Sequence, residues 1–153
     1  MTFEIFVSRN IKADREFVFD WWTDLSPDDT KLVKPLKSRE ILSRSPERIL
    51  LRDEEQIYFR KMQFDVEVTL HRPEMWSSNY EGKSATARSD YRLLAETDGT
   101  TTLNYSTRIE PHGFLTSIFS PVVKPFVKKV FVGEMDIFIR TLERDYTKQK
   151  IVD

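Results

Sequence analysis

The sequence predicts an α+β fold in which a curved antiparallel sheet of seven strands wraps around one long C-terminal helix. Three observations predict this arrangement. A strand-like segment and a short aromatic helical segment come first, a long run of strand-like segments follows, and an amphipathic helical pattern closes the chain. A chain of 153 residues has the size of one domain, so we expect residues 1–153 to form a single domain with its own core. Elements in this order favour a sheet and a helix that enclose a cavity.

The N-terminal segment predicts one strand and two short helices. Apolar and polar residues alternate from Phe3 to Ile11, which is typical of a half-buried strand. Asp14 can then cap a helix whose apolar residues recur at spacings of three and four: Phe17, Val18, Trp21, Trp22 and Leu25. Ser26 and Pro27, followed by two aspartates, form a second helix start, which predicts a short helix to about Val33.

The middle of the chain predicts six further strands, because β-branched and aromatic residues are separated there by proline and glycine turns. We place these strands at residues 38–45, 48–58, 61–71, 75–82, 86–96 and 101–110. The strand at 61–71 has the clearest alternation of apolar and polar residues, which favours an antiparallel sheet with one wet face. Asp98 and Gly99 favour a tight hairpin between the last two strands, because both residues tolerate positive φ.

The C-terminal segment predicts a long helix with an irregular start. Apolar residues recur at three and four from Phe114 to Leu142. Pro121 and Pro125 prevent one uninterrupted helix, since a proline inside a helix costs about 3 kcal/mol. Ser120 and Pro121 suit a cap and a first helical position, so we expect a short turn before them and a bend near Pro125.

Composition excludes several classes of site. A net charge of −1 lacks the positive footprint of a nucleic-acid-binding protein, and the absence of cysteine excludes disulfides and thiolate chemistry. The chain shows no signal peptide and no apolar run of about 20 residues, so we expect a cytoplasmic protein. No nucleophile elbow, phosphate-binding glycine loop or dinucleotide fingerprint is present, and we expect no cofactor.

Two segments carry a family resemblance. Residues 11–25 (IKADREFVFDWWTDL) and residues 99–113 resemble the polyketide cyclase/dehydrase and lipid-transport branch of the START-like (SRPBCC) superfamily. That superfamily shares the helix-grip fold with the plant-pollen-allergen-like proteins, and the predicted element order matches it. The resemblance implies one START-like ligand-binding domain with a pocket, and not a particular reaction. Aromatic-ring hydroxylases hold iron with two histidines and a carboxylate, whereas this chain has only His71 and His112, so we expect no metal site.

Strand parity indicates which residues face the predicted pocket. The expected ligand-binding residues are Phe64, Trp76, Tyr80, Tyr91, Tyr105, His112, Phe119 and Phe126. His112 stands in the turn before the last helix, where it can act as an acid or base near neutral pH. Polar contacts on the inner side are expected from Ser43, Ser77, Asn79 and Thr107. Charged residues on the solvent-facing side of the predicted strands are expected to form ion pairs with neighbouring strands. They are Asp65, Glu67, Arg88, Asp90, Arg92 and Arg108.

Three functions remain open at this point. The first is binding, transport or sequestration of a small hydrophobic or aromatic molecule in the cavity. The second is a cyclase or dehydratase in which Tyr91, Tyr105 or His112 transfers protons. The third is an interaction module whose hydrophobic closing helix or apolar segment 114–126, beside Lys124, Lys128 and Lys129, docks on a membrane or a partner protein. Packing of that segment on its own sheet is the competing interpretation. We make no prediction of the oligomeric state.

Overall fold

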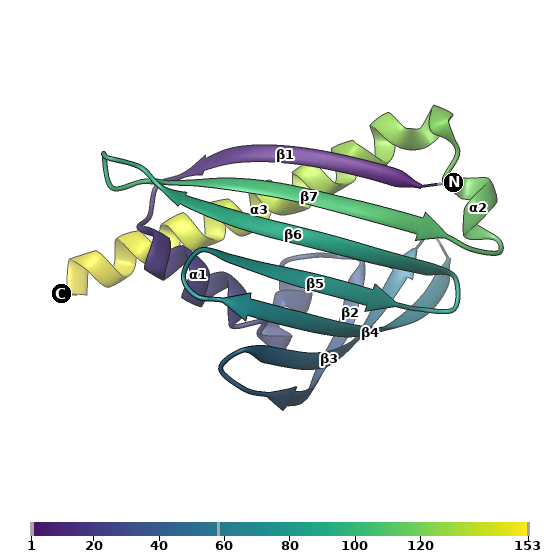
Figure 1. Ribbon diagram of the computed structural model, residues 1–153, viewed down its shortest axis with the longest axis horizontal. Helices are drawn as coiled ribbons and strands as arrows, with labels where there is room; N and C mark the ends of the chain where they lie inside the picture. Colours follow the sequence, from purple (N-terminus) through teal and green to yellow (C-terminus); the bar gives the residue numbers. More distant parts are fainter. Residues whose placement is uncertain (1, 58, 153) are drawn as a thin grey trace.

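A computed structural model describes residues 2–57 and 59–152 and shows the predicted α+β arrangement (Figure 1). The chain begins with β1 (Phe3–Ile11), α1 (Arg15–Thr23) and the 3-10 helix η1 (Pro27–Lys31). Six strands follow: β2 (Leu36–Arg44), β3 (Arg48–Ile57), β4 (Arg60–His71), β5 (Met75–Glu81), β6 (Ala85–Ala95) and β7 (Thr101–Pro111). The chain ends with α2 (Leu115–Ile118), the 3-10 helix η2 (Pro121–Val123) and α3 (Lys124–Val152).

The strands form one antiparallel sheet in the order β1-β7-β6-β5-β4-β3-β2. In Figure 1 the sheet lies in front, and α3 runs diagonally behind β1, β7 and β6 with α1 on the same side. We call this helix-covered side the inner face of the sheet. The predicted seven-stranded sheet around a long C-terminal helix is therefore confirmed.

Side-chain caps set the start of both helical elements after β1. The carboxylate of Asp14 accepts a hydrogen bond from the backbone N–H of Phe17 at 2.8 Å. The hydroxyl of Ser26 accepts one from the backbone N–H of Asp28 at 3.1 Å, and Pro27 follows it. The second element is a 3-10 helix and not an α-helix, because Pro35 stops it before a second full turn can form.

The strand boundaries differ from the predicted ones by a few residues. β2 starts at Leu36 and not at 38, because two register irregularities, between Leu36 and Ser38 and between Ile41 and Ser43, interrupt its alternation. The predicted end of the next strand, residue 58, lies outside the described residues. In the turn after β6, Gly99 has a φ of +85°, as predicted, but Asp98 does not have a positive φ, and residues 96–100 form the loop between the paired Ala95 and Thr101.

The C-terminal helix is longer than predicted. Pro125 lies in the first turn of α3, where its missing N–H is not needed, and the change from η2 to α3 falls directly before it, between Val123 and Lys124. Pro121 occupies the start of η2 directly after Ser120, as predicted. The helix continues beyond Leu142 to Val152, and no helix in the described part of the chain is long and apolar enough to cross a membrane.

The second half of α3 fastens the helix to the rest of the fold. Its buried residues are Met135, Ile139 and Leu142. Three polar contacts add to this packing: Arg9 with Asp136 at 3.0 Å, the indole N–H of Trp21 with Asp145 at 2.9 Å, and the hydroxyl of Tyr146 with Asp14 at 3.1 Å. On the side away from the sheet, the first turns of α3 carry exposed apolar residues, with Phe126 72% and Val130 55% exposed. On the sheet side, Val127 and Phe131 pack against the core and are partly buried.

Candidate functional site

An aromatic cluster fills one end of the space between the sheet and α3. Trp76, Tyr91 and Tyr105 are cross-strand neighbours on β5, β6 and β7. The rings of Trp76 and Tyr91 stack with centroids 4.7 Å apart, and the Tyr91 and Tyr105 centroids are 4.8 Å apart. The ring centroid of Trp22 of α1 lies 5.9 Å from those of Trp76 and Tyr91, and 5.5 Å from that of Phe138 of α3. Parity correctly predicted that the three strand residues face inward.

Small hydroxyl residues form the next row of the inner face. Ser78, Ser89 and Thr107 are cross-strand neighbours, and the hydroxyl of Ser89 donates to that of Thr107 at 2.9 Å. Thr107 was correctly expected on this side. Ser77 and Asn79 alternate with Trp76, Ser78 and Tyr80, so they face outward and their predicted inner position was wrong. Ser43 is exposed at the edge strand, where a register irregularity shifts the alternation.

A buried charged network lies where η1, β2 and β3 meet. The guanidinium of Arg39 donates to both carboxylate oxygens of Asp53, at 2.8 and 2.9 Å, and to Asp29 at 2.9 Å. The side chains of Arg39 and Asp53 are only 9% and 1% exposed. Burial raises the pKa of Asp29 to about 6, although the charge of Arg39 acts in the opposite direction. Asp53 is the cross-strand neighbour of Phe64, which places the network on the inner face.

Two further carboxyl groups face the interior without a partner. Glu55 follows Asp53 by two residues on β3, and Glu134 lies on α3. Burial raises the pKa of each to about 7, and the charges of Asp53 and Glu134 add to the effect on Glu55. Within residues 2–57 and 59–152, neither glutamate side chain forms a hydrogen bond or an ion pair.

The carboxyl groups of these two glutamates are accessible to solvent. Every fully buried polar side-chain atom in the described part of the chain has a hydrogen-bond partner. Because Glu55 and Glu134 have none, their carboxyl oxygens must retain accessible surface. Tyr80 and Tyr91 also point inward and are nevertheless only half-buried. We call the region that these four side chains border the interior space.

Tyrosine hydroxyls share the interior space with the carboxyl groups. Burial raises the pKa of Tyr80, Tyr91 and Tyr105. The charge of Glu134 raises the pKa of Tyr91 and Tyr105 further, and that of Glu55 does the same for Tyr80, which indicates that these groups surround one region. All three tyrosines therefore stay protonated near neutral pH and can donate hydrogen bonds.

Phe64 packs closely against Tyr80 and Gly82 at the border of this space. Its ring centroid lies 6.4 Å from that of Tyr80. A side-chain Cβ at Gly82 would come within 2.8 Å of the Phe64 ring, so glycine is required at this position for the ring to pack over the end of β5.

The surface also contains two grooves that are less suited to a ligand. A groove of about 660 Å³ on the outer face of the sheet is lined by charged side chains together with apolar and neutral polar ones. Asp65 and Glu67, which were predicted to pair across strands, do so with Arg52 and Arg48, both at 2.9 Å, so these carboxylates are already satisfied. A second groove of about 590 Å³ lies beside α1 and is lined in part by Trp21.

The structure brings most of the predicted site residues together. Phe64, Trp76, Tyr80, Tyr91 and Tyr105 all face the inner side. Phe119 is half-buried at the edge, with its ring 5.3 Å from that of Phe3.

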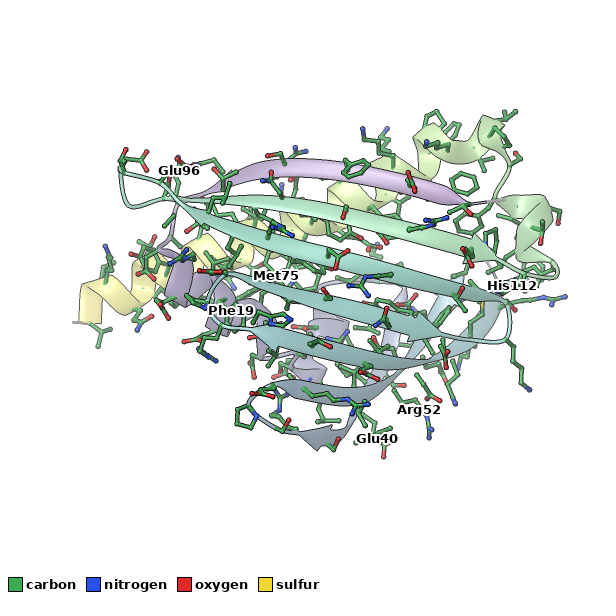
Figure 2. All side chains as sticks on the ribbon, viewed as in Figure 1. Phe19, Glu40, Arg52, Met75, Glu96 and His112 are labelled. Atoms are coloured by element: carbon green, nitrogen blue, oxygen red, sulfur yellow. The ribbon has the colours of Figure 1, made fainter. Side chains whose placement is uncertain are left out.

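Two predicted site residues lie elsewhere. His112 is exposed after the end of β7, and Figure 2 shows it at the opposite end of the sheet from Phe19 of α1. Gly113, with a φ of +59°, turns the chain away directly after it. Phe126 precedes the buried Met135 by nine residues, and at 100° per residue this separation puts the two side chains on opposite sides of α3. Neither residue joins the interior space.

Sequence reasoning missed four charged residues of this site: Arg39, Asp53, Glu55 and Glu134. A signal was present for three of them. Asp53 and Glu55 continue the inward parity of Ile49 and Leu51 on β3, and Glu134 lies three and four residues from Phe131 and Phe138 on the apolar stripe of α3. Arg39 follows a register irregularity, so parity could not place it. In the described residues, no three or more His, Cys, Asp and Glu side chains are grouped to hold a metal ion.

Comparison with known proteins identifies the fold. No family model matches the sequence, and no curated protein sequence matches it either. The Zhui aromatase/cyclase from Streptomyces sp. R1128 superposes with a TM-score of 0.77 at 11% identity, over 94% of this chain and 95% of that one. A START superfamily protein from Mycobacterium smegmatis gives 0.66 at 16% identity, over 95% and 98% of the two chains. The major latex-like protein 151 from Panax ginseng gives 0.67 at 10% identity, over 95% and 98%. The chain therefore has the same helix-grip fold as these three proteins.

Proposed function

We propose that this protein binds a small, largely aromatic or apolar molecule in the interior space between the sheet and α3. One observation carries the proposal: two inward-facing carboxyl groups without hydrogen-bond partners keep accessible surface beside inward-facing tyrosines and an aromatic cluster. A core that existed only for packing would not leave Glu55 and Glu134 without partners, since desolvated carboxyl groups are costly. Aromatic walls with a few polar groups are typical of small-molecule sites.

The N-terminal part of α3 offers the entrance. The helix is fastened by residues from Met135 onward, whereas the residues that its first turns direct toward the core, Val127 and Phe131, are only partly buried. At the same end, the guanidinium of Arg60 lies 4.3 Å above the ring of Phe114 and links the start of β4 to the segment before α2. A ligand therefore enters beside this segment without disturbing the anchored half of α3.

Binding is expected to raise the melting temperature and to change tryptophan emission. A ligand at 100 times its Kd adds about 2.7 kcal/mol, on the order of 5–10 °C for a chain of this size. The probes are 2-naphthol, 2-(1-naphthyl)ethylamine and a flavone, measured by differential scanning fluorimetry. Because Trp22 and Trp76 belong to the aromatic cluster, emission at 350 nm should respond to the same probes.

A matched pair of variants on β6 locates the bound probe. Ala87 lies opposite Tyr80 on the inner face, so Ala87→Leu fills part of the interior space and is expected to weaken binding by about ten-fold. Ala95→Leu, at the exposed end of the same strand, should leave the affinity unchanged. Unchanged melting temperatures across the panel, or equal effects of the two variants, would count against the proposal.

A second candidate function, a cyclase or dehydratase, is favoured by the two glutamates. With pKa values of about 7, Glu55 and Glu134 can exchange protons near neutral pH. We propose that a glutamate carboxylate takes the proton from the carbon next to a ligand carbonyl, while Tyr91 or Tyr105 donates a hydrogen bond to the carbonyl oxygen. The tyrosines, whose pKa burial raises, serve as donors and not as bases. His112 is too peripheral to take part in this arrangement.

Proton exchange measures this second function directly. The test follows deuterium incorporation from D₂O into the methyl group of 2-acetonaphthone by NMR. The protein is expected to accelerate exchange, and Glu134→Gln or Glu55→Gln to lower the acceleration by about a hundred-fold. Glu96→Gln, the same change at an exposed turn, is the control and should have no effect. Exchange no faster than in buffer alone removes this candidate and leaves the binding proposal intact.

A further inference from the structure

The charges around the interior space do not balance. Four carboxyl groups face this region: Asp29, Asp53, Glu55 and Glu134. The one cation that the described structure places among them is Arg39, and all of its hydrogen bonds to side chains go to Asp53 and Asp29. Arg9 of β1, which reaches α3, is paired with Asp136 at 3.0 Å. The charge of Arg39 acts on Glu55 without a hydrogen bond between them, and neither Glu55 nor Glu134 forms an ion pair of its own.

The two unpaired glutamates stand on different walls of the same space. Glu55 projects from β3 in the sheet, and Glu134 projects from α3, which covers the sheet. The charge of Glu134 acts on Glu55, and also on Tyr91 and Tyr105. The acidic pair therefore borders the region that begins at the aromatic cluster, and a ligand of modest length can touch both.

Each kind of ligand charge has a different consequence at this site. An anion would add a negative charge to a region that already has an excess of carboxyl groups. A neutral apolar molecule would displace water from both carboxyl groups and offer them no partner, which is costly. A protonated amine would donate charge-assisted hydrogen bonds to the carboxylates, and the faces of Trp22, Trp76 and Tyr91 attract a cation as well.

We propose that the molecule bound in the interior space is an aromatic or apolar amine whose ammonium group lies between Glu55 and Glu134. This inference rests on the proposed binding function and specifies its ligand class. The aromatic cluster holds the apolar body, and the glutamate pair selects the charge.

Three probes with one naphthalene body test the charge preference at pH 8: 2-(1-naphthyl)ethylamine, 2-(1-naphthyl)ethanol and 1-naphthylacetate. Affinities are measured by isothermal titration calorimetry. The amine is expected to bind at least about ten-fold more tightly than the alcohol, and the carboxylate more weakly than both. Glu55→Gln and Glu134→Gln should each reduce the ratio of amine to alcohol affinity, with little change for the alcohol. Glu96→Gln serves as the matched control and should keep the ratio.

The pH dependence supplies an independent readout. The groups that face the two glutamates are Asp53, Arg39, Tyr80, Tyr91 and Tyr105. Because the amine stabilises the ionised carboxylates, its affinity should fall from pH 8 to pH 6, and that of the alcohol should stay level. Binding of the amine at pH 7 should release protons, which calorimetry in buffers of different ionisation enthalpy detects.

The outcomes separate this inference from the proposed function. If the alcohol binds as tightly as the amine, or if the glutamate variants leave the ratio unchanged, the amine inference is overturned and the binding function stands. If none of the three probes binds and the apolar panel leaves the melting temperature unchanged, both fail. A preference for the amine that both glutamate variants abolish, in proteins whose circular dichroism is unaltered, supports the inference.

Discussion

Replacing Arg39 with leucine is expected to lower the free energy of unfolding by about 3–5 kcal/mol, because the change leaves Asp53 buried without a counter-charge. Both oxygens of Asp53 accept hydrogen bonds from Arg39, and the aspartate side chain is only 1% exposed. Asp29 loses its 2.9 Å contact at the same time. A domain is stable by about 5–15 kcal/mol in total, so the variant should unfold at a much lower urea concentration, followed by circular dichroism.

A second substitution distinguishes lost charge balance from lost packing. In the double variant Arg39→Leu/Asp53→Leu no unpaired charge remains at Asp53, and most of the lost stability should return. Arg52→Leu is the surface control, since Arg52 is paired with Asp65 at side-chain exposures of 42% and 59%. It should cost less than about 1 kcal/mol. Equal losses for Arg39→Leu and Arg52→Leu, or no recovery in the double variant, would contradict the buried network as described.

Periodicity explains why the fold and the aromatic cluster could be predicted from the sequence. The alternation along β4 and β7 is regular, so parity placed Phe64 and Tyr105 on the inner face, and the cross-strand register then brings Tyr105 beside Tyr91. The long run of strand segments between two helical patterns was enough to identify the sheet and its closing helix. These signals can be read from each segment alone, without knowing which other segments of the chain it packs against.

The charged part of the site depends on contacts that no local pattern encodes. Arg39 belongs to the site only because β2 pairs with β3 through two register irregularities, which change the parity along the strand. Glu134 belongs to it because α3 lies across the inner face with this side chain toward the tyrosines. Past Leu142, α3 is held by polar contacts such as Trp21 with Asp145 and by Tyr146, whose ring centroid lies 4.9 Å from that of Phe17, so a single aromatic residue continues the apolar stripe there.

The stability of the free protein is expected to fall as the pH rises from about 4.5 to about 7. The pKa of Glu55 and of Glu134 rises from 4.5 to about 7 on folding, chiefly through burial. Between these two values the folded state binds more protons than the unfolded state, so the free energy of unfolding decreases with pH. A full shift of this size equals about 3 kcal/mol per group. Because solvent reaches both carboxyl groups, the expected loss of stability is about 1–2 kcal/mol each. Asp29, whose pKa rises from 3.8 to about 6, acts in the same direction at lower pH.

Glutamine substitutions isolate the contribution of the pair. At pH 8 the double variant Glu55→Gln/Glu134→Gln should be more stable than the wild type by about 2–4 kcal/mol, because the wild type must desolvate two ionised carboxylates. At pH 4 the two proteins should differ little, since both glutamates are then mostly protonated in either state. Urea unfolding at both pH values measures the difference, with Glu96→Gln as the control for the substitution itself. The same pH dependence in wild type and double variant would show that the two ionised glutamates do not destabilise the folded protein. A gain at pH 8 would mean that the chain retains two destabilising carboxylates, which is expected where a ligand supplies the missing counter-charge.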